Sequence, residues 1–163
     1  MAIIRITDQY FWNVVFGLFF LVLLVLAVII LETESFKTVA ELTLLDFVLM
    51  TLATMRLVRL FVYDTMTKVI REQCYDVVKG EGGMELIKPK VGPRRTLAEL
   101  LSCPWCFGLW AGASVSFFYL LTPLAFFPVL ILAISGVASY LQIVANLTGH
   151  KADEQKSKNE RGF

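Results

Sequence analysis

The hydrophobic residues are concentrated in long blocks that contain no Asp, Glu, Lys or Arg. One block covers residues 11–31, and a longer block covers residues 100–149. Because a helix of about 20 apolar residues crosses the hydrocarbon core of a bilayer, the first block predicts one membrane span and the second predicts two. Thr122 and Pro123 predict a tight turn that divides the second block into spans over residues 105–121 and 124–147.

A further span is predicted over residues 42–63, although this segment contains three charged residues. We expect Asp46 to lie in the interface near the outer end of the span. Arg56 and Arg59 are expected about two turns and about one turn inside its cytoplasmic end. The predicted fold class is therefore an all-α, polytopic integral membrane protein, a bundle of four transmembrane helices with a short cytoplasmic interfacial helix.

The same pattern divides the chain into three parts. Residues 1–41 hold the first span and an outer loop, and residues 42–147 hold the other three spans. Residues 148–163 are predicted to form a disordered cytoplasmic tail. The first apolar block is too long for a signal peptide and is followed by no small-residue cleavage site, so we interpret it as a retained helix.

The connection between the second and third spans covers residues 65–102. Residues 65–79 are predicted to continue the second span as a helix, and the Gly- and Pro-rich residues 80–95 are predicted to form a loop. Thr96 and Glu99 have the spacing of a capping box, which predicts a short interfacial helix directly before the third span.

Composition and charge agree with a membrane protein and predict its orientation. The chain is 57% hydrophobic and 18% charged, with a mean hydropathy of +0.69 and a net charge of +1. Seven basic residues lie between Asp64 and Ser102 and four follow His150, whereas residues 32–41 contain one lysine and three glutamates. Since cytoplasmic segments carry the excess of Lys and Arg, both termini and the long connection are predicted to be cytoplasmic.

Two motifs carry a family resemblance. Residues 52–72 read LATMRLVRLFVYDTMTKVIRE, and residues 100–110 read LLSCPWCFGLW. Together they resemble a bacterial family of small membrane proteins catalogued as domain of unknown function 1360. The matching positions are Arg56, Leu57, Arg59, Leu60, Asp64, Arg71, Ser102, Cys103, Cys106, Gly108 and Trp110. The resemblance covers residues 42–147 and implies a location in the bacterial plasma membrane; some members are linked to spore formation, and no reaction is implied.

The Cys-x-x-Cys pair at Cys103 and Cys106 has three interpretations. The thiols can be small apolar groups packed at the membrane surface. They can form a redox pair, because a helix N-terminus lowers the pKa of a thiol. They can also bind zinc as part of a Cys₃His site with Cys74 and His150, which are predicted to lie on the same face of the membrane.

Arg56 and Arg59 are the candidate residues for binding an anion or a lipid. An Arg costs at least about 2.5 kcal/mol near the centre of a span and less near its end. Both side chains can extend to the lipid phosphates without any binding site, or they can hold an anionic group inside the bundle. Asp64 is close enough along the chain to neutralise one of them, or it can cap the interfacial segment. We expect the partner surface on the last span, where four polar residues recur at three- and four-residue steps: Ser135, Ser139, Gln142 and Asn146.

Small residues on the third span form a stripe with a period of four, Gly108, Gly112 and Ser116. Such stripes let helix backbones approach closely in lipid. We expect Gly136 and Ser139 on the fourth span to provide the facing surface, unless the stripe packs against a second copy of the chain.

The sequence favours a non-enzymatic function, since it shows no nucleophile–base–acid set, no phosphate-binding loop and no nucleic-acid motif. The leading hypothesis is a membrane scaffold that binds lipids, a second copy of the chain or another membrane protein. One alternative is a thiol-redox or zinc-binding protein centred on the cysteine pair. The other is an oligomeric transporter or pore lined by the polar face of the fourth span.

Overall fold

The computed structural model describes residues 2–80, 83–90 and 92–160, which form helices and one short β-hairpin. The helices and strands are α1 (Ala2–Glu34), η1 (Val39–Glu41), α2 (Leu44–Val62), η2 (Thr65–Thr67), α3 (Lys68–Glu72), β1 (Asp76–Gly80), β2 (Gly83–Ile87), α4 (Pro93–Ser102), α5 (Pro104–Leu121), η3 (Pro123–Ala125) and α6 (Phe126–Glu160). Here η marks a 3₁₀ helix. The predicted helical fold is thus confirmed, with the hairpin as a departure.

Three helical segments are long and apolar enough to cross a membrane, judged by length and composition. They are Tyr10–Glu34 in α1, Pro104–Leu121, which is α5, and Pro123–Lys156, which is mostly α6. Helix α2 has 19 residues and is not one of these segments, because Asp46, Arg56 and Arg59 raise its charge. The prediction of a helical membrane fold is therefore supported for three of the four expected spans.

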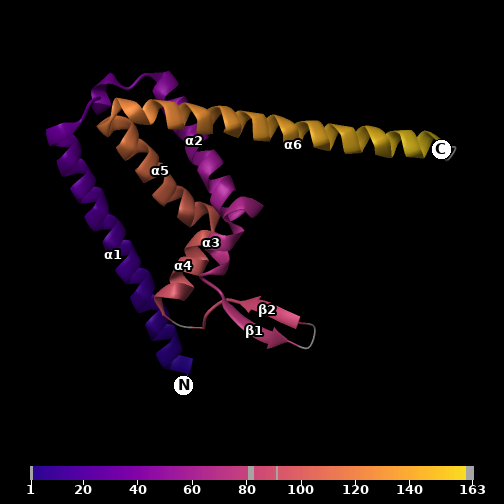
Figure 1. The fold of residues 1–163 in the computed structure, drawn as a ribbon, viewed down its shortest axis with the longest axis horizontal. Helices are drawn as coiled ribbons and strands as arrows, with labels where there is room; N and C mark the ends of the chain where they lie inside the picture. The colour runs from indigo at the N-terminus through magenta and orange to yellow at the C-terminus, as the bar shows by residue number, and fades with distance from the viewer. Residues whose placement is uncertain (1, 81–82, 91, 161–163) are drawn as a thin grey trace.

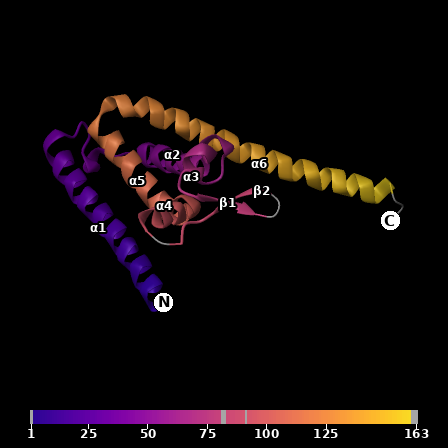
Figure 2. The ribbon, with the colours of Figure 1, turned by 60° about the horizontal axis from the view of Figure 1, so that its bottom comes forward.

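The connections between helices gather at two ends of the molecule. The α1–α2 loop and the α5–α6 turn lie together at one end, which we call the outer end, and α4 and the hairpin lie at the other, inner end (Figure 1). The backbone N–H groups of Phe36 and Lys37 both donate to the Leu120 carbonyl, at 3.0 and 3.2 Å, and so join the two outer connections. The second half of α6 projects away from the other helices (Figures 1 and 2).

Helix α2 is central, because α5 and α6 contact it on opposite sides. On the α5 side, a Cβ at Gly108 would lie 3.6 Å from Val58 Cγ2, and a Cβ at Gly112 would lie 3.6 Å from Thr54 Cγ2. The small-residue stripe of α5 therefore packs against α2 of the same chain. Ser116, the third member of the stripe, is half-buried.

The contact with α6 is closer still. A Cβ at Gly136 would lie 3.0 Å from the Leu52 carbonyl oxygen and 3.4 Å from Arg56 Cβ, so glycine is what allows the two backbones to approach. The expectation that Gly136 faces the α5 stripe is wrong, because α2 lies between them. Ala53, which is fully buried, is at the centre of the apolar core around α2 with Met50 and Val115.

Asp46 anchors the outer end of α2, where its side chain is buried. Its Oδ2 accepts hydrogen bonds from Lys37 Nζ at 2.6 Å and from the backbone and hydroxyl of Thr43 at 2.9 and 2.7 Å. Its Oδ1 accepts one from the Tyr119 hydroxyl of α5. The sequence did not predict these partners, because it is the tertiary structure that brings Lys37 and Tyr119 to Asp46.

The connection at the inner end differs from the prediction for residues 65–79 and 80–95. The chain turns at Asp64 instead of continuing the helix, and β1 pairs with β2 in an antiparallel hairpin from Asp76↔Ile87 to Gly80↔Gly83. Val77 and Val78 favour an extended backbone over a helix. Residues 81, 82 and 91 of the predicted loop lie outside the described residues.

The other helix ends also shift from their predicted positions. Helix α4 begins at Pro93 after Gly92, whose φ of +95° favours glycine, so the predicted capping box does not start it. The predicted Thr96 cap is buried and donates to Asn13 Oδ1 instead, at 3.4 Å. Helix α6 continues to Glu160 where a disordered tail was expected, since residues 150–158 are rich in strong helix formers. Residues 161–163 of that tail lie outside the described residues.

Replacing Gly136 with alanine should lower the free energy of unfolding by about 1–3 kcal/mol, because the added methyl group meets a backbone oxygen that cannot move aside cheaply. Thermal unfolding of the purified protein in detergent measures the loss. Gly17→Ala is the matched control, since a Cβ at Gly17 would meet no atom within 4 Å apart from the adjacent backbone of its own helix. Equal stability of the two variants would contradict the close α2–α6 contact.

Replacing Asp46 with asparagine should lower the unfolding temperature by several degrees. The substitution leaves Lys37 without its carboxylate and weakens the link from α2 to Tyr119. Asp153→Asn, on the exposed part of α6, makes the same charge change without a buried partner and should unfold at the wild-type temperature. If both variants unfold at the same temperature, the hydrogen bonds of Asp46 do not stabilise the outer end of α2.

Candidate anion-binding groove

Arg56 joins the inner half of α2 to α6. Its Nε donates to Ser135 Oγ at 2.9 Å, and its Nη1 forms an ion pair with Asp64 Oδ2 at 3.1 Å. The Arg56 side chain is 19% exposed, and the carboxylate beside it offsets its charge. The predicted pairing of a motif arginine with Asp64 and with the polar face of the last helix is therefore present for Arg56.

Arg71, the last basic residue of the Arg-Leu-x-Arg-Leu motif region, has a structural role at the end of α2. Its guanidinium donates to the carbonyl oxygens of Val62 and Asp64, and the Thr67 hydroxyl donates to the carbonyl of Leu60. These bonds satisfy the carbonyl groups that the last turn of a helix leaves without partners. Sequence reasoning did not identify this role, because the partners are backbone atoms that no side-chain pattern marks.

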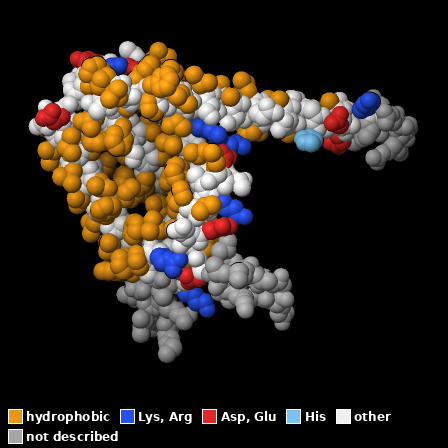
Figure 3. Space-filling model, viewed as in Figure 1, with side chains coloured by type: hydrophobic (Ala, Val, Ile, Leu, Met, Phe, Trp, Pro, Cys, Tyr) orange, Lys and Arg blue, Asp and Glu red, His pale blue; other side chains and the backbone are white. Residues whose placement is uncertain are grey.

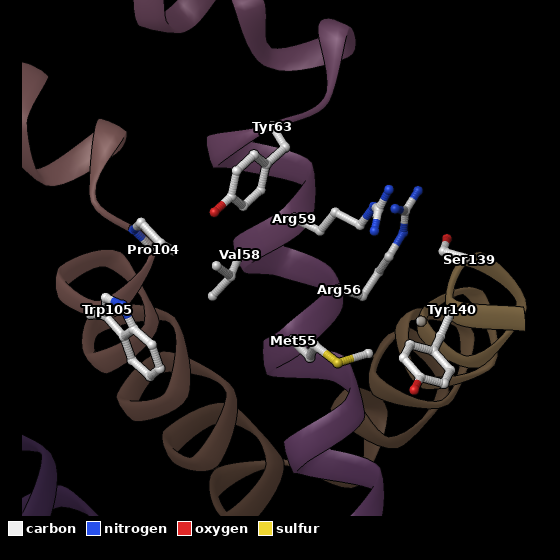
Figure 4. A pocket seen from close by; sticks show the side chains of 10 residues that line it. Met55, Arg56, Val58, Arg59, Tyr63, Pro104, Trp105, Ser139 and Tyr140 are labelled. Atoms are coloured by element: carbon white, nitrogen blue, oxygen red, sulfur yellow. The ribbon is translucent and has the colours of Figure 1, made fainter. Parts of the chain in front are cut away.

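Arg59 differs from both of these arginines. Within residues 2–80, 83–90 and 92–160, no hydrogen bond or ion pair of its side chain is present, and the residue is exposed. In the view of Figure 4, its side chain extends from α2 in the same direction as that of Arg56. An arginine offers five N–H donors in a planar fork that matches the oxygens of a phosphate or carboxylate.

The two guanidinium groups border a groove of about 460 Å³ between α2 and its two neighbours. Helix α2 supplies Met55, Val58 and both arginines, α5 supplies Pro104 and Trp105, and α6 supplies Ser139 and Tyr140 (Figure 4). Trp105 is 88% exposed and Tyr140 is 60% exposed. The groove therefore combines two cations at one end with apolar and aromatic walls.

The rest of the polar face of α6 does not reach the arginines by any hydrogen bond. Gln142 Nε2 donates to Asn146 Oδ1 at 3.1 Å, and both residues are exposed. Ser139 lines the groove, and its hydroxyl donates to the Ser135 carbonyl at 2.8 Å. Of the four predicted partners, Ser135 and Ser139 lie at the arginines, because α6 leaves the bundle beyond them (Figure 1).

Cys103 and Cys106 lie close together at the start of α5. Cys103 is the N-cap residue, and its sulfur accepts a hydrogen bond from the Cys106 N–H at 3.3 Å. Hydrogen bonds from the thiol and the backbone of Cys106 hold the pKa of the Cys103 thiol below its usual value. Cys103 is half-buried and Cys106 is exposed. The pair lies at the edge of a second cavity between α1 and α5.

The four predicted zinc ligands are not brought together. Cys74 is half-buried at the end of α3, with its thiol 4.0 Å from the Ile70 carbonyl. His150 lies on the projecting part of α6 (Figure 3). In the described part of the chain, no group of three or more His, Cys, Asp or Glu residues lies close enough to hold a metal ion.

The comparisons with known proteins confirm the family resemblance. Residues 49–145 match the family described as "Protein of unknown function (DUF1360)". The sporulation protein YjcA of Bacillus subtilis (strain 168) is 32% identical over 108 residues, which cover 63% of this chain and 92% of YjcA. The UPF0713 protein YngL of the same strain is 29% identical over 118 residues, which cover 72% of this chain and 91% of YngL. No solved structure matches the chain.

The matched residues include the groove and both motif cysteines. They begin inside α2 and end inside α6, so α1 lies outside the family match. Because this match covers more than half of the chain, the protein belongs to the DUF1360 family.

Proposed function

We propose that this protein crosses the bacterial plasma membrane four times, with α2 as its second span. The 19 residues of α2 rise about 28 Å, close to the thickness of the hydrocarbon core. Two of its charges have partners near the helix ends, Asp46 with Lys37 and Arg56 with Asp64, which lowers the cost of placing them in a membrane. Contact with α5 on one side and α6 on the other also supports this assignment.

Both termini and the connection over residues 65–102 then face the cytoplasm. The excess of basic residues in this connection supports that orientation. The acidic outer loop supports it too, and this loop is joined to the α5–α6 turn through the Leu120 carbonyl.

Single cysteines at Val39 and Lys90 test this topology in a variant whose three native cysteines are serines. A membrane-impermeant maleimide added to intact cells should label Val39→Cys, because this position lies in the outer loop and is 72% exposed. Lys90→Cys should be labelled only after the cells have been permeabilised. Labelling of both positions in intact cells would mean that α2 does not cross the membrane.

Within this topology, the protein has a non-enzymatic function, in which the groove beside Arg59 holds an anionic group of a lipid or of a neighbouring membrane protein. The observation that carries this proposal is the guanidinium of Arg59, which borders the groove without an ion-pair partner among the described residues. An uncompensated cation near hydrocarbon is costly, and an anionic ligand offsets that cost. Such binding would let the protein act as a scaffold, because the ligand would connect this helix bundle to the surrounding lipids or to a neighbouring membrane protein.

A photo-reactive residue at Tyr140 tests this function in living cells. It should form an adduct with a lipid or a membrane protein, and Arg59→Gln should reduce the yield about tenfold, as expected for the loss of a charge-assisted contact. The control site is Ile134, which lies on the same helix, is 62% exposed and does not line the groove. Its adducts should not change in Arg59→Gln. A Tyr140 adduct that is indifferent to Arg59 would overturn the proposal.

A further inference from the structure

The charge at the groove fits a ligand with one negative charge. Arg56 and Arg59 both line the groove, and the Asp64 carboxylate offsets the charge of Arg56. One positive charge is therefore left, and it is on the exposed Arg59. The phosphodiester of a glycerophospholipid carries one negative charge, and its oxygens fit the donor fork of an arginine.

The position of the charge along α2 matches the level of lipid head groups. Arg59 lies in the last turn of α2, where Tyr63 is 64% exposed, and Trp105 in the first turn of α5 is 88% exposed. Trp and Tyr side chains concentrate at the boundary between the hydrocarbon and the head groups. The arginine end of the groove therefore lies at the depth of a phosphate in the inner leaflet.

The walls of the groove continue from this charged end into apolar surface. Met55 and Val58 lie toward the middle of α2, with Tyr140 of α6 on one side and Trp105 of α5 on the other (Figure 4). The volume of about 460 Å³ is in the range of pockets that hold small molecules. A small soluble anion would fill the charged end and leave these apolar walls uncovered, whereas a phospholipid would cover both with its phosphate and an acyl chain.

We propose that this groove binds one anionic glycerophospholipid of the inner leaflet, with its phosphate against Arg59 and Arg56 and an acyl chain along Met55 and Val58. The inference rests on the proposed function, and it names the ligand. Lipids without net charge bind more weakly, because their own cationic head group competes with the arginines for the phosphate. Net charge thus selects the lipid, and the arginine fork fixes its position.

Native mass spectrometry of the full chain in detergent tests the proposal, with phosphatidylglycerol, phosphatidylcholine or inorganic phosphate added. The wild type should retain one phosphatidylglycerol, bind phosphatidylcholine about tenfold more weakly, and keep its lipid in the presence of millimolar phosphate. Arg59→Gln should lose about tenfold in affinity for phosphatidylglycerol and unfold at the wild-type temperature, because the Arg59 side chain has no hydrogen bond or ion pair within the described chain. Arg59→Lys keeps the positive charge but loses the planar fork of donors. Its affinity for phosphatidylglycerol should therefore lie between those of the wild type and Arg59→Gln.

Lys90→Gln is the matched control for charge. It removes one positive charge from the same side of the molecule, at an exposed residue that does not line the groove. An equal loss of phosphatidylglycerol in Lys90→Gln, equal binding of phosphatidylcholine, or displacement by inorganic phosphate would overturn the proposal. An Arg59-dependent Tyr140 adduct with a protein instead of a lipid would also overturn it, but would leave the proposed function standing. If no Arg59-dependent ligand is found by either method, both proposals fail.

Discussion

Helix α2 brings two charged side chains, Asp46 and Arg56, between two largely apolar helices, and the fold depends on how each of these charges is satisfied. Asp46 is satisfied at the outer end by Lys37, Thr43 and Tyr119. Arg56 is satisfied near the inner end by Asp64 and Ser135. An unpaired charge in such surroundings costs several kcal/mol, so each partner must be held in place by the rest of the chain. The loops and turns at both ends of α2 follow from this requirement.

The two ends of α2 are fixed by different means. At the outer end, one carboxylate receives bonds from a loop lysine, a cap residue and α5, and so joins three segments at a single buried group. At the inner end, Thr67 and Arg71 bond to backbone carbonyls of the last turn and bring the chain back on itself. This reversal places Asp64 where it can reach Arg56. Between the two ends, glycines on α5 and α6 let both helices pack closely on α2.

The motif residues of the family therefore divide into two groups with different roles. Arg56, Asp64 and Arg71 have partners within the chain and are explained by the fold. Arg59 is not, because its side chain is exposed at the inner end and has no hydrogen bond or ion pair with the described residues. Residues of the second kind are those expected to act on something outside the chain, which is why the proposed function rests on Arg59. The thiol pair, with its lowered Cys103 pKa, lies at the other cavity of the same end.

The sequence by itself determined the apolar helices, their short connections and the family, because these depend on hydrophobic length, charge and local motifs. It also indicated that Asp64 could neutralise one of the two arginines, and the structure shows that this arginine is Arg56. Only the tertiary structure decided that α2 lies between α5 and α6, that Asp46 is buried and that Arg59 has no hydrogen-bond or ion-pair partner among the described residues. These features depend on which helices meet, and side-chain spacing within one helix carries no information about the residues that a different helix brings to it.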